Sequence, residues 1–205
     1  MSPWELTLLA AYASLIVEIT CFPVPSEASV VQLLGRSEAA GGGALDAARS
    51  AAVSSKVVHY LLPTALCVAL FALPLVAMYS PESRRLVAPW TAVELQWPGV
   101  AVVLLGRALT FVSVLQLRAA KRRHELPAGL FAFSRNPGLV GMFVMYIGLC
   151  LAVGGPWLWL GAPLYFWNMH GRVRLEESDL QARHTDAWSR YAVDVPRYLA
   201  LPGLR

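Results

Sequence analysis

Charged residues are scarce in this chain: Asp, Glu, Lys and Arg make up only 15% of its 205 residues. A soluble domain carries about 25% charged residues. Here 57% of the residues are hydrophobic, and the mean hydropathy is +0.52. This balance is typical of a membrane protein. The net charge of +4 is modest, and the basic residues gather at the ends of apolar runs. That pattern favours membrane topology signals over nucleic-acid binding.

Several motifs of known chemistry are missing. The three cysteines stand alone in or beside apolar runs, and the four histidines have no metal-ligand spacing. We therefore expect packed cysteines and no metal site. The chain has no Gly-x-Gly-x-x-Gly, Walker loop or Gly-x-Ser-x-Gly, which argues against a Rossmann methyltransferase or dehydrogenase. The first apolar run has neither a basic start nor a small-residue cleavage site, so we do not interpret it as a cleaved signal peptide.

Apolar runs dominate what is present. The two final runs are short for a bilayer crossing of about 20 residues, and Gly154-Gly155-Pro156 between them predicts a tight helical hairpin. We predict an all-α integral membrane bundle of about five transmembrane helices. The five runs cover residues 3–22, 57–79, 98–117, 138–153 and 157–169.

Two further segments complete this organisation. Residues 23–56 contain prolines, three consecutive glycines and many alanines and serines, which predicts a loop or a short surface helix. Residues 172–191 have a helical, amphipathic pattern, which predicts a C-terminal cytosolic helix.

The positive charges predict the orientation. Lysines and arginines follow the first, third and fifth runs, whereas Arg84 and Arg85 alone follow the second. Cytoplasmic loops are enriched in Lys and Arg, so we expect the N-terminus outside and the C-terminus in the cytoplasm. Both ends of the hairpin then face the cytoplasm.

Arg135-Asn136-Pro137 opens the fourth run. Proline suits the first turn of a helix, and the free N–H groups of that turn can bind a carboxylate. Arg135 adds a fixed positive charge. Gly138 and Gly141 let a ligand or another helix approach closely. A capped helix with an interfacial arginine explains the same tripeptide.

Acidic residues mark the other end of the hairpin. Glu176 and Glu177 lie just beyond the membrane exit, where a carboxylate can accept hydrogen bonds from ribose hydroxyls or an ammonium, or pair with an arginine. Arg107 lies in the middle of the third run, where a charge is costly unless it is paired or hydrated. We expect Arg107 to face the bundle interior, with Glu18, Glu94 or the Glu176–Glu177 pair as partner.

The order of these motifs resembles that of the isoprenylcysteine carboxyl methyltransferase and phospholipid methyltransferase superfamily of integral membrane enzymes. That family has a His-x-Leu-Val-Thr-x-Gly-x-Tyr block, then Arg-His-Pro-x-Tyr-x-Gly, a hairpin, Arg-x-x-x-Glu-Glu-x-x-Leu, an aromatic-rich helix and Val-Pro. Asn136 and Leu139 depart from it, since they replace a histidine and a tyrosine. The matching positions are His124, Glu125, Leu126, Gly129, Leu130, Phe131, Arg135, Asn136, Pro137, Gly141, Arg172, Glu176, Glu177, Leu180, Trp188, Tyr191, Val195 and Pro196.

The resemblance implies S-adenosylmethionine as methyl donor and a lipophilic acceptor that enters from the bilayer. It divides the chain into N-terminal membrane helices (1–97) and a methyltransferase core (98–205). The implied donor-binding residues are His124, Leu126, Gly129, Arg135, Asn136, Pro137, Gly141, Glu176 and Glu177.

The acceptor stays open between a prenylcysteine carboxylate, a phospholipid amine and another hydrophobic small molecule. A carboxylate acceptor needs a cation such as Arg107, Arg172 or Arg197, whereas an amine must lose a proton, for which Tyr191 is a candidate. Arg107, Arg172 and Tyr191 are therefore the candidate catalytic residues. The alternatives are a nicotinamide-dependent membrane reductase, because sterol reductases resemble the same superfamily, and a non-catalytic membrane binding protein.

Overall fold

The protein is described here from a computed structural model that covers residues 3–21, 65–76, 79, 82, 93–123, 128–154, 156–183 and 185–199. Every regular element in these ranges is a helix, which confirms the predicted all-α class. The elements are α1 (Pro3–Cys21), a helical segment over Ala65–Val76, α5 (Val93–Arg123), the 3-10 helix η1 (Gly129–Ala132), α6 (Pro137–Val153), α7 (Pro156–Arg183) and α8 (Thr185–Asp194).

One described helix is long and apolar enough to cross a membrane, over Glu94–Ala120 within α5. Shorter apolar helices cover Glu5–Val17, Ala65–Val76 and Pro137–Val153. Each of these falls on an apolar run of the sequence. Length and composition therefore support membrane association, and the number of crossings stays a prediction.

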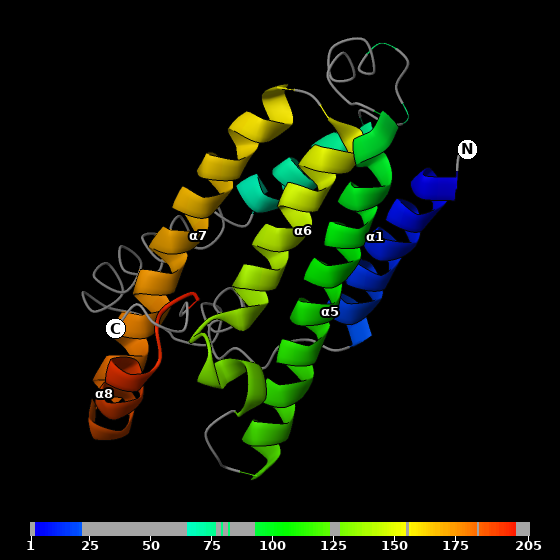
Figure 1. Cartoon of the computed structure of the whole chain (residues 1–205). Coiled ribbons are helices and arrows are strands. Elements are labelled where there is room, and N and C mark those ends of the chain that lie inside the picture. Colours follow the sequence, from blue (N-terminus) through cyan, green and yellow to red (C-terminus); the bar gives the residue numbers. More distant parts are fainter. Residues whose placement is uncertain are drawn as a thin grey trace, which may run out of the picture.

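The long helices lie side by side (Figure 1). α5 and α6 run antiparallel, α7 lies beside α6, and α1 lies against the other side of α5 and points the same way as α5. The N-terminus of α6, the C-terminus of α7 and α8 therefore gather at one end of the bundle.

Glycines bring α5 and α6 into close contact. A Cβ on Gly141 of α6 would lie 2.6 Å from Thr110 Oγ1 and 2.8 Å from the carbonyl oxygen of Gly106 on α5. A Cβ on Gly148 would lie 2.8 Å from the carbonyl oxygen of Gly99. Membrane helices depend on such small residues because apolar surface alone does not drive them together in lipid.

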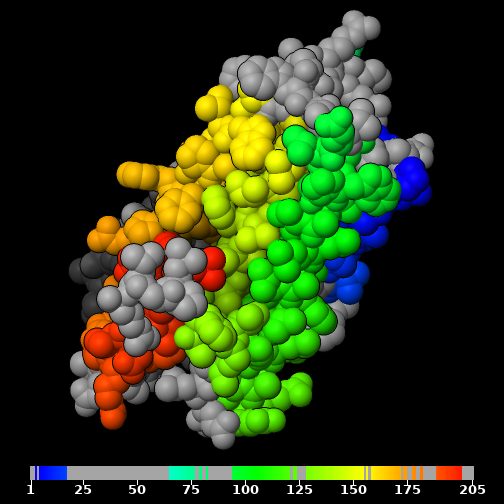
Figure 2. Space-filling model, in the orientation of Figure 1, coloured from blue at the N-terminus to red at the C-terminus, as the bar shows by residue number. Residues whose placement is uncertain are grey.

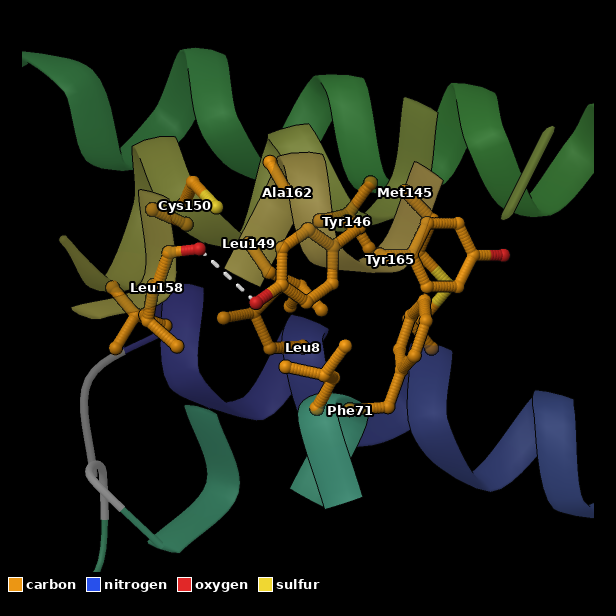
Figure 3. Close-up of a cluster of buried hydrophobic side chains, with 14 of the residues drawn as sticks. Leu8, Phe71, Met145, Tyr146, Leu149, Cys150, Leu158, Ala162 and Tyr165 are labelled. Atoms are coloured by element: carbon orange, nitrogen blue, oxygen red, sulfur yellow. Dashed lines mark hydrogen bonds between the residues drawn. The ribbon is translucent and has the colours of Figure 1, made fainter. Parts of the chain in front are cut away.

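Aromatic rings fill the core on the other side of α6 (Figure 3). Tyr146 and Tyr165 stack with their ring centroids 5.7 Å apart, and Phe71 meets both rings edge-on. Tyr146 donates a hydrogen bond to the carbonyl of Leu158 at 3.1 Å, and Tyr12 of α1 donates one to the carbonyl of Phe71 at 2.7 Å. The first bond joins α6 to α7 and the second joins α1 to the 65–76 segment, while the Phe71 ring brings this segment against the hairpin.

The hairpin forms where it was expected. Gly154 ends α6 with a positive φ of 77°, and its N–H bonds to the carbonyl of Cys150. Glycine adopts this conformation without steric cost. α7 then begins at Pro156.

Two predicted boundaries are wrong. The fifth run and the amphipathic segment were expected as separate elements, but α7 continues from Pro156 to Arg183, and a second helix, α8, follows. The charges that begin at Arg172 mark a change of surroundings and do not interrupt the helix, because Arg, Glu and Leu are good helix formers. α5 likewise extends beyond residues 98–117. Residues 23–56 lie outside the described residues, and the division of the chain at residue 97 stays a prediction.

Candidate functional site

Hydrogen bonds join the loop before α6 to a C-terminal segment about sixty residues further along the chain. The backbone N–H of Arg135 donates to the carbonyl of Pro196 at 2.9 Å. Asn136 Nδ2 donates to the carbonyl of Arg197 at 3.1 Å. Asn136 stands at the N-cap of α6 but makes no side-chain capping bond. Its amide group therefore joins two segments instead of ending a helix.

Glu177 is the acidic residue at the centre of the site. It lies on α7 and is only 8% exposed. Arg197 donates to Oε2 through Nε at 2.9 Å and Nη2 at 2.7 Å. Nη1 of Arg135 lies 3.3 Å from Oε1. The hydrogen bond to Glu177 raises the pKa of the Arg197 guanidinium. A carboxylate this deeply placed needs such partners, because an unpaired buried charge is strongly destabilising.

α8 contributes two aromatic side chains, Trp188 and Tyr191, to the site. The Arg135 guanidinium lies 5.9 Å from the ring centroid of Trp188, within cation–π range. Tyr191 donates a hydrogen bond to the carbonyl of Phe131 at 2.8 Å. Burial raises the pKa of Tyr191, and the nearby Arg135 opposes this shift. The Tyr191 hydroxyl thereby holds η1 in place, and its role as a base stays a prediction.

Two buried polar atoms of this cluster make no hydrogen bond to any described residue. They are Nε of Arg135, a donor, and Oε1 of Glu177, an acceptor. Oε1 is close enough to Arg135 for an ion pair but does not meet hydrogen-bond geometry. Buried polar atoms in folded proteins nearly always have a partner. These two atoms are therefore suited to a ligand that carries both a donor and an acceptor.

The structure brings together four of the residues singled out from the sequence: Arg135, Asn136, Glu177 and Tyr191. Pro137 opens α6 as expected. Gly129 begins η1 with a φ of 73°, beside Gln116 of α5, whose Oε1 accepts the N–H of Leu130 at 2.9 Å.

Gly141 has a different role from the one implied for it. The resemblance placed it in the donor site, but its open face lies against Thr110 and Gly106 of α5. Of the two partners considered for this glycine, a ligand or a helix, the structure has the helix.

Arg107 lies away from the cluster. It is 7% exposed and faces the bundle interior, as predicted, and its Nε donates to Ser14 Oγ of α1 at 3.1 Å. Glu94, one expected partner, is exposed at the start of α5. The expected carboxylate of Glu177 is bound to Arg135 and Arg197 instead.

The remaining site predictions lie outside the described part. His124 and Leu126 are not among the described residues, and the same holds for the side chains of Glu18, Arg172 and Glu176. Their roles stay predictions. Among the side chains that are described, no group of three or more His, Cys, Asp or Glu is placed to hold a metal ion.

Arg197 is the residue whose role in this site the sequence did not reveal. It was considered as a cation for the acceptor, whereas its side chain is bound to Glu177 and its carbonyl to Asn136. The available signal was the Val195-Pro196 pair, because the residue before a proline favours an extended conformation. Helical periodicity gives no information on where such a segment folds back.

No family model, curated protein or solved structure matches this chain.

Proposed function

We propose that the chain is an integral membrane methyltransferase that uses S-adenosylmethionine to methylate a lipophilic acceptor. The site lies at one end of the helical bundle, the end where α5 finishes in exposed Arg122 and Arg123. The positive-inside rule assigns this end to the cytoplasm, where a water-soluble donor is available. Exposed apolar side chains on α5 and α7, such as Leu105, Leu160 and Trp167, support contact with lipid.

The charges of the cluster suit the donor. Two guanidiniums share one carboxylate, so a positive charge is left over beside a half-buried loop. An amino-acid group carries a carboxylate and an ammonium next to each other, and Arg is the residue best shaped to bind a carboxylate. The ammonium complements Glu177.

Nε of Arg135 and Oε1 of Glu177 have no hydrogen-bond partner among the described residues, and this observation carries the proposal. Nε of Arg135 offers a hydrogen bond to a carboxylate, and Oε1 of Glu177 accepts one from an ammonium. The donor supplies an electrophilic methyl group on a sulfonium. The chain itself binds, orients and shields the reactants from water.

Calorimetry with the detergent-purified full chain tests the proposal. We expect S-adenosylmethionine and S-adenosylhomocysteine to bind, and Glu177→Gln to weaken that binding by about tenfold or more, equivalent to about 1.4 kcal/mol. Arg135→Gln should have an effect of the same order. Glu94→Gln is the matched control, because Glu94 is exposed at the opposite end of α5.

The other candidate functions predict different results. Binding of NADPH in place of the adenosyl ligands would point to the reductase. The absence of binding by all three ligands would favour a non-catalytic membrane protein. Equal losses of binding affinity in Glu177→Gln and Glu94→Gln would contradict the assignment of ligand binding to the site around Glu177.

A further inference from the structure

One face of α7 changes from apolar to charged along its length. Phe166, His170, Val173 and Glu177 follow each other at intervals of three and four residues, so they lie on one side of the helix. At about 1.5 Å per residue, His170 precedes Glu177 by roughly 10 Å on the way in from the apolar part of the bundle. Along this face Phe166 is exposed, His170 is half-buried, and Val173 and Glu177 are buried.

His170 is paired with a residue of the C-terminal segment. Its Nδ1 lies 2.8 Å from the Tyr198 hydroxyl. The Phe166 ring centroid lies 6.0 Å from that of His170 and 5.5 Å from that of Tyr198. Phe143 of α6 meets Phe166 at 5.8 Å. In Figure 2, red atoms of the C-terminal segment lie between the orange atoms of α7 and the yellow-green atoms of α6. An aromatic row therefore leads from α6 to the charged cluster.

Two of the three cations suggested for an anionic acceptor have other partners. Arg197 holds Glu177 with two nitrogens, and Arg107 donates to Ser14 on α1. A carboxylate acceptor is also ionised already at neutral pH, so it needs no base. A histidine–tyrosine pair beside the exposed apolar ring of Phe166 suits an acceptor that must lose a proton.

We propose that His170 and Tyr198 bind the reactive group of the acceptor and take up its proton, so that the acceptor is a lipophilic amine or hydroxyl compound. This inference rests on the proposed function. Methylation of an acceptor X–H breaks the S–CH₃ bond, forms an X–CH₃ bond, leaves the electron pair on sulfur and releases one proton. That proton passes to the Tyr198 oxygen as the Tyr198 hydroxyl proton passes to Nδ1 of His170. The half-buried imidazole then returns it to water.

The surroundings of the pair agree with this role. Burial raises the pKa of Tyr198, while Arg197 opposes the shift and Glu177 adds to it. Tyr198 therefore keeps its proton near neutral pH and can hand it on. Nδ1 of His170, 2.8 Å from this hydroxyl, is placed to receive the proton. The charged groups acting on Tyr198 are Arg197 and Glu177.

Three probes in detergent micelles test the acceptor class: dodecylamine, 4-dodecylphenol and dodecanoic acid. With radiolabelled S-adenosylmethionine we expect methylation of the amine or the phenol and not of the acid. His170→Gln and Tyr198→Phe should lower the rate by about 100-fold, the usual scale of proton-transfer catalysis. Neither should change the affinity for S-adenosylhomocysteine. Tyr79→Phe, at an exposed tyrosine outside the site, is the matched control.

Two measurements separate a proton-accepting role from a structural one. With the phenol, the wild-type rate should be lower in D₂O than in H₂O because a proton is transferred, and His170→Gln should lose this difference. Without any donor present, 4-dodecylphenol should slow the modification of His170 by diethyl pyrocarbonate, read by mass spectrometry, and dodecanoic acid should not. The other three histidines serve as internal references.

Each result decides a different point. If S-adenosylhomocysteine binds but only the acid is methylated, or neither the amine nor the phenol is, the acceptor inference is wrong and the proposed function stands. Wild-type rates in His170→Gln and Tyr198→Phe, or no protection of His170, also contradict it. Loss of adenosyl-ligand binding as such contradicts the proposed function.

Discussion

Glu177 holds two arginines from distant parts of the chain with one carboxylate. Arg197 binds Oε2 twice, and Arg135 approaches Oε1. The planar guanidinium can donate from two nitrogens to one oxygen, which a lysine ammonium on its flexible stem does less well. The guanidinium of Arg197 is also partly exposed, with 35% of its side chain accessible. Water can therefore compete with that pair more easily than with the pair to Arg135.

Tyr191 gives a residue-scale prediction. Tyr191→Phe removes the hydrogen bond to Phe131 and should lower the free energy of unfolding by about 1 kcal/mol near neutral pH. Because the pKa of Tyr191 is raised in the folded protein, its contribution is present below about pH 10 and is lost as the pH rises above that value. The difference between wild type and variant should shrink accordingly. Thermal unfolding followed by circular dichroism, near neutral pH and above about pH 10, measures this difference in stability.

Tyr79→Phe is again the matched control, since Tyr79 is exposed. A gap between wild type and Tyr191→Phe that stays constant or widens at high pH would contradict this assignment.

At the scale of elements, the fit of α5 against α6 positions the loop that carries Arg135. Their glycines lie at intervals of seven residues, Gly99 and Gly106 on α5, Gly141 and Gly148 on α6, and each faces the opposite helix. Because backbone atoms meet there, neither helix can move aside for a side chain without shifting the start of α6. The site is thus fixed by packing as well as by ion pairs.

Gly106→Ala should destabilise the protein by roughly 1–3 kcal/mol through overpacking, because its Cβ would meet the backbone of Met145 and of Gly141 at 2.6 Å. Gly171→Ala on α7 is the control. A Cβ there meets nothing within 4 Å, so alanine should stabilise the helix by about 0.5–1 kcal/mol. Melting temperatures in detergent compare the two variants. A neutral Gly106→Ala would contradict the close contact.

Helix positions could largely be predicted from the sequence, but helix ends could be predicted only where a residue with a strong local preference marks them. Pro137 and Gly154 gave α6 its limits, because each residue has a strong local preference at a helix end. No such residue marks the point within α7 where the apolar run ends, so the end of that run at residue 169 was mistaken for a helix boundary. Gly141 shows a related limit: the absence of a side chain predicts a close approach but not what approaches.

At the scale of the whole molecule, the relative directions of the helices bear on the predicted number of membrane crossings. α1 and α5 point one way and α6 points the other, which is consistent with one intervening crossing between α1 and α5. That the Arg135 loop and Glu177 lie at the same end of the molecule was predicted from topology, because both ends of a hairpin lie on one side. The contribution of Arg197 was not, since it depends on an extended segment without periodicity.

Sided labelling checks the orientation. In a cysteine-free background, Glu94→Cys and Arg122→Cys place thiols at exposed positions near opposite ends of α5. In sealed bacterial spheroplasts, a membrane-impermeant maleimide should label Glu94→Cys and leave Arg122→Cys unmodified until the membrane is permeabilised. Labelling of both positions before permeabilisation would contradict the predicted crossing.

The bond between the Arg135 backbone and Pro196 has a consequence for biosynthesis. Asn136 and Arg197 are separated by 61 residues in the chain. At about 5–20 residues per second, a ribosome needs roughly 3–12 seconds to make the intervening stretch. Until that stretch is complete, Arg135 and Glu177 lack their third partner. The charged cluster is therefore completed only after both helices of the hairpin have been synthesised.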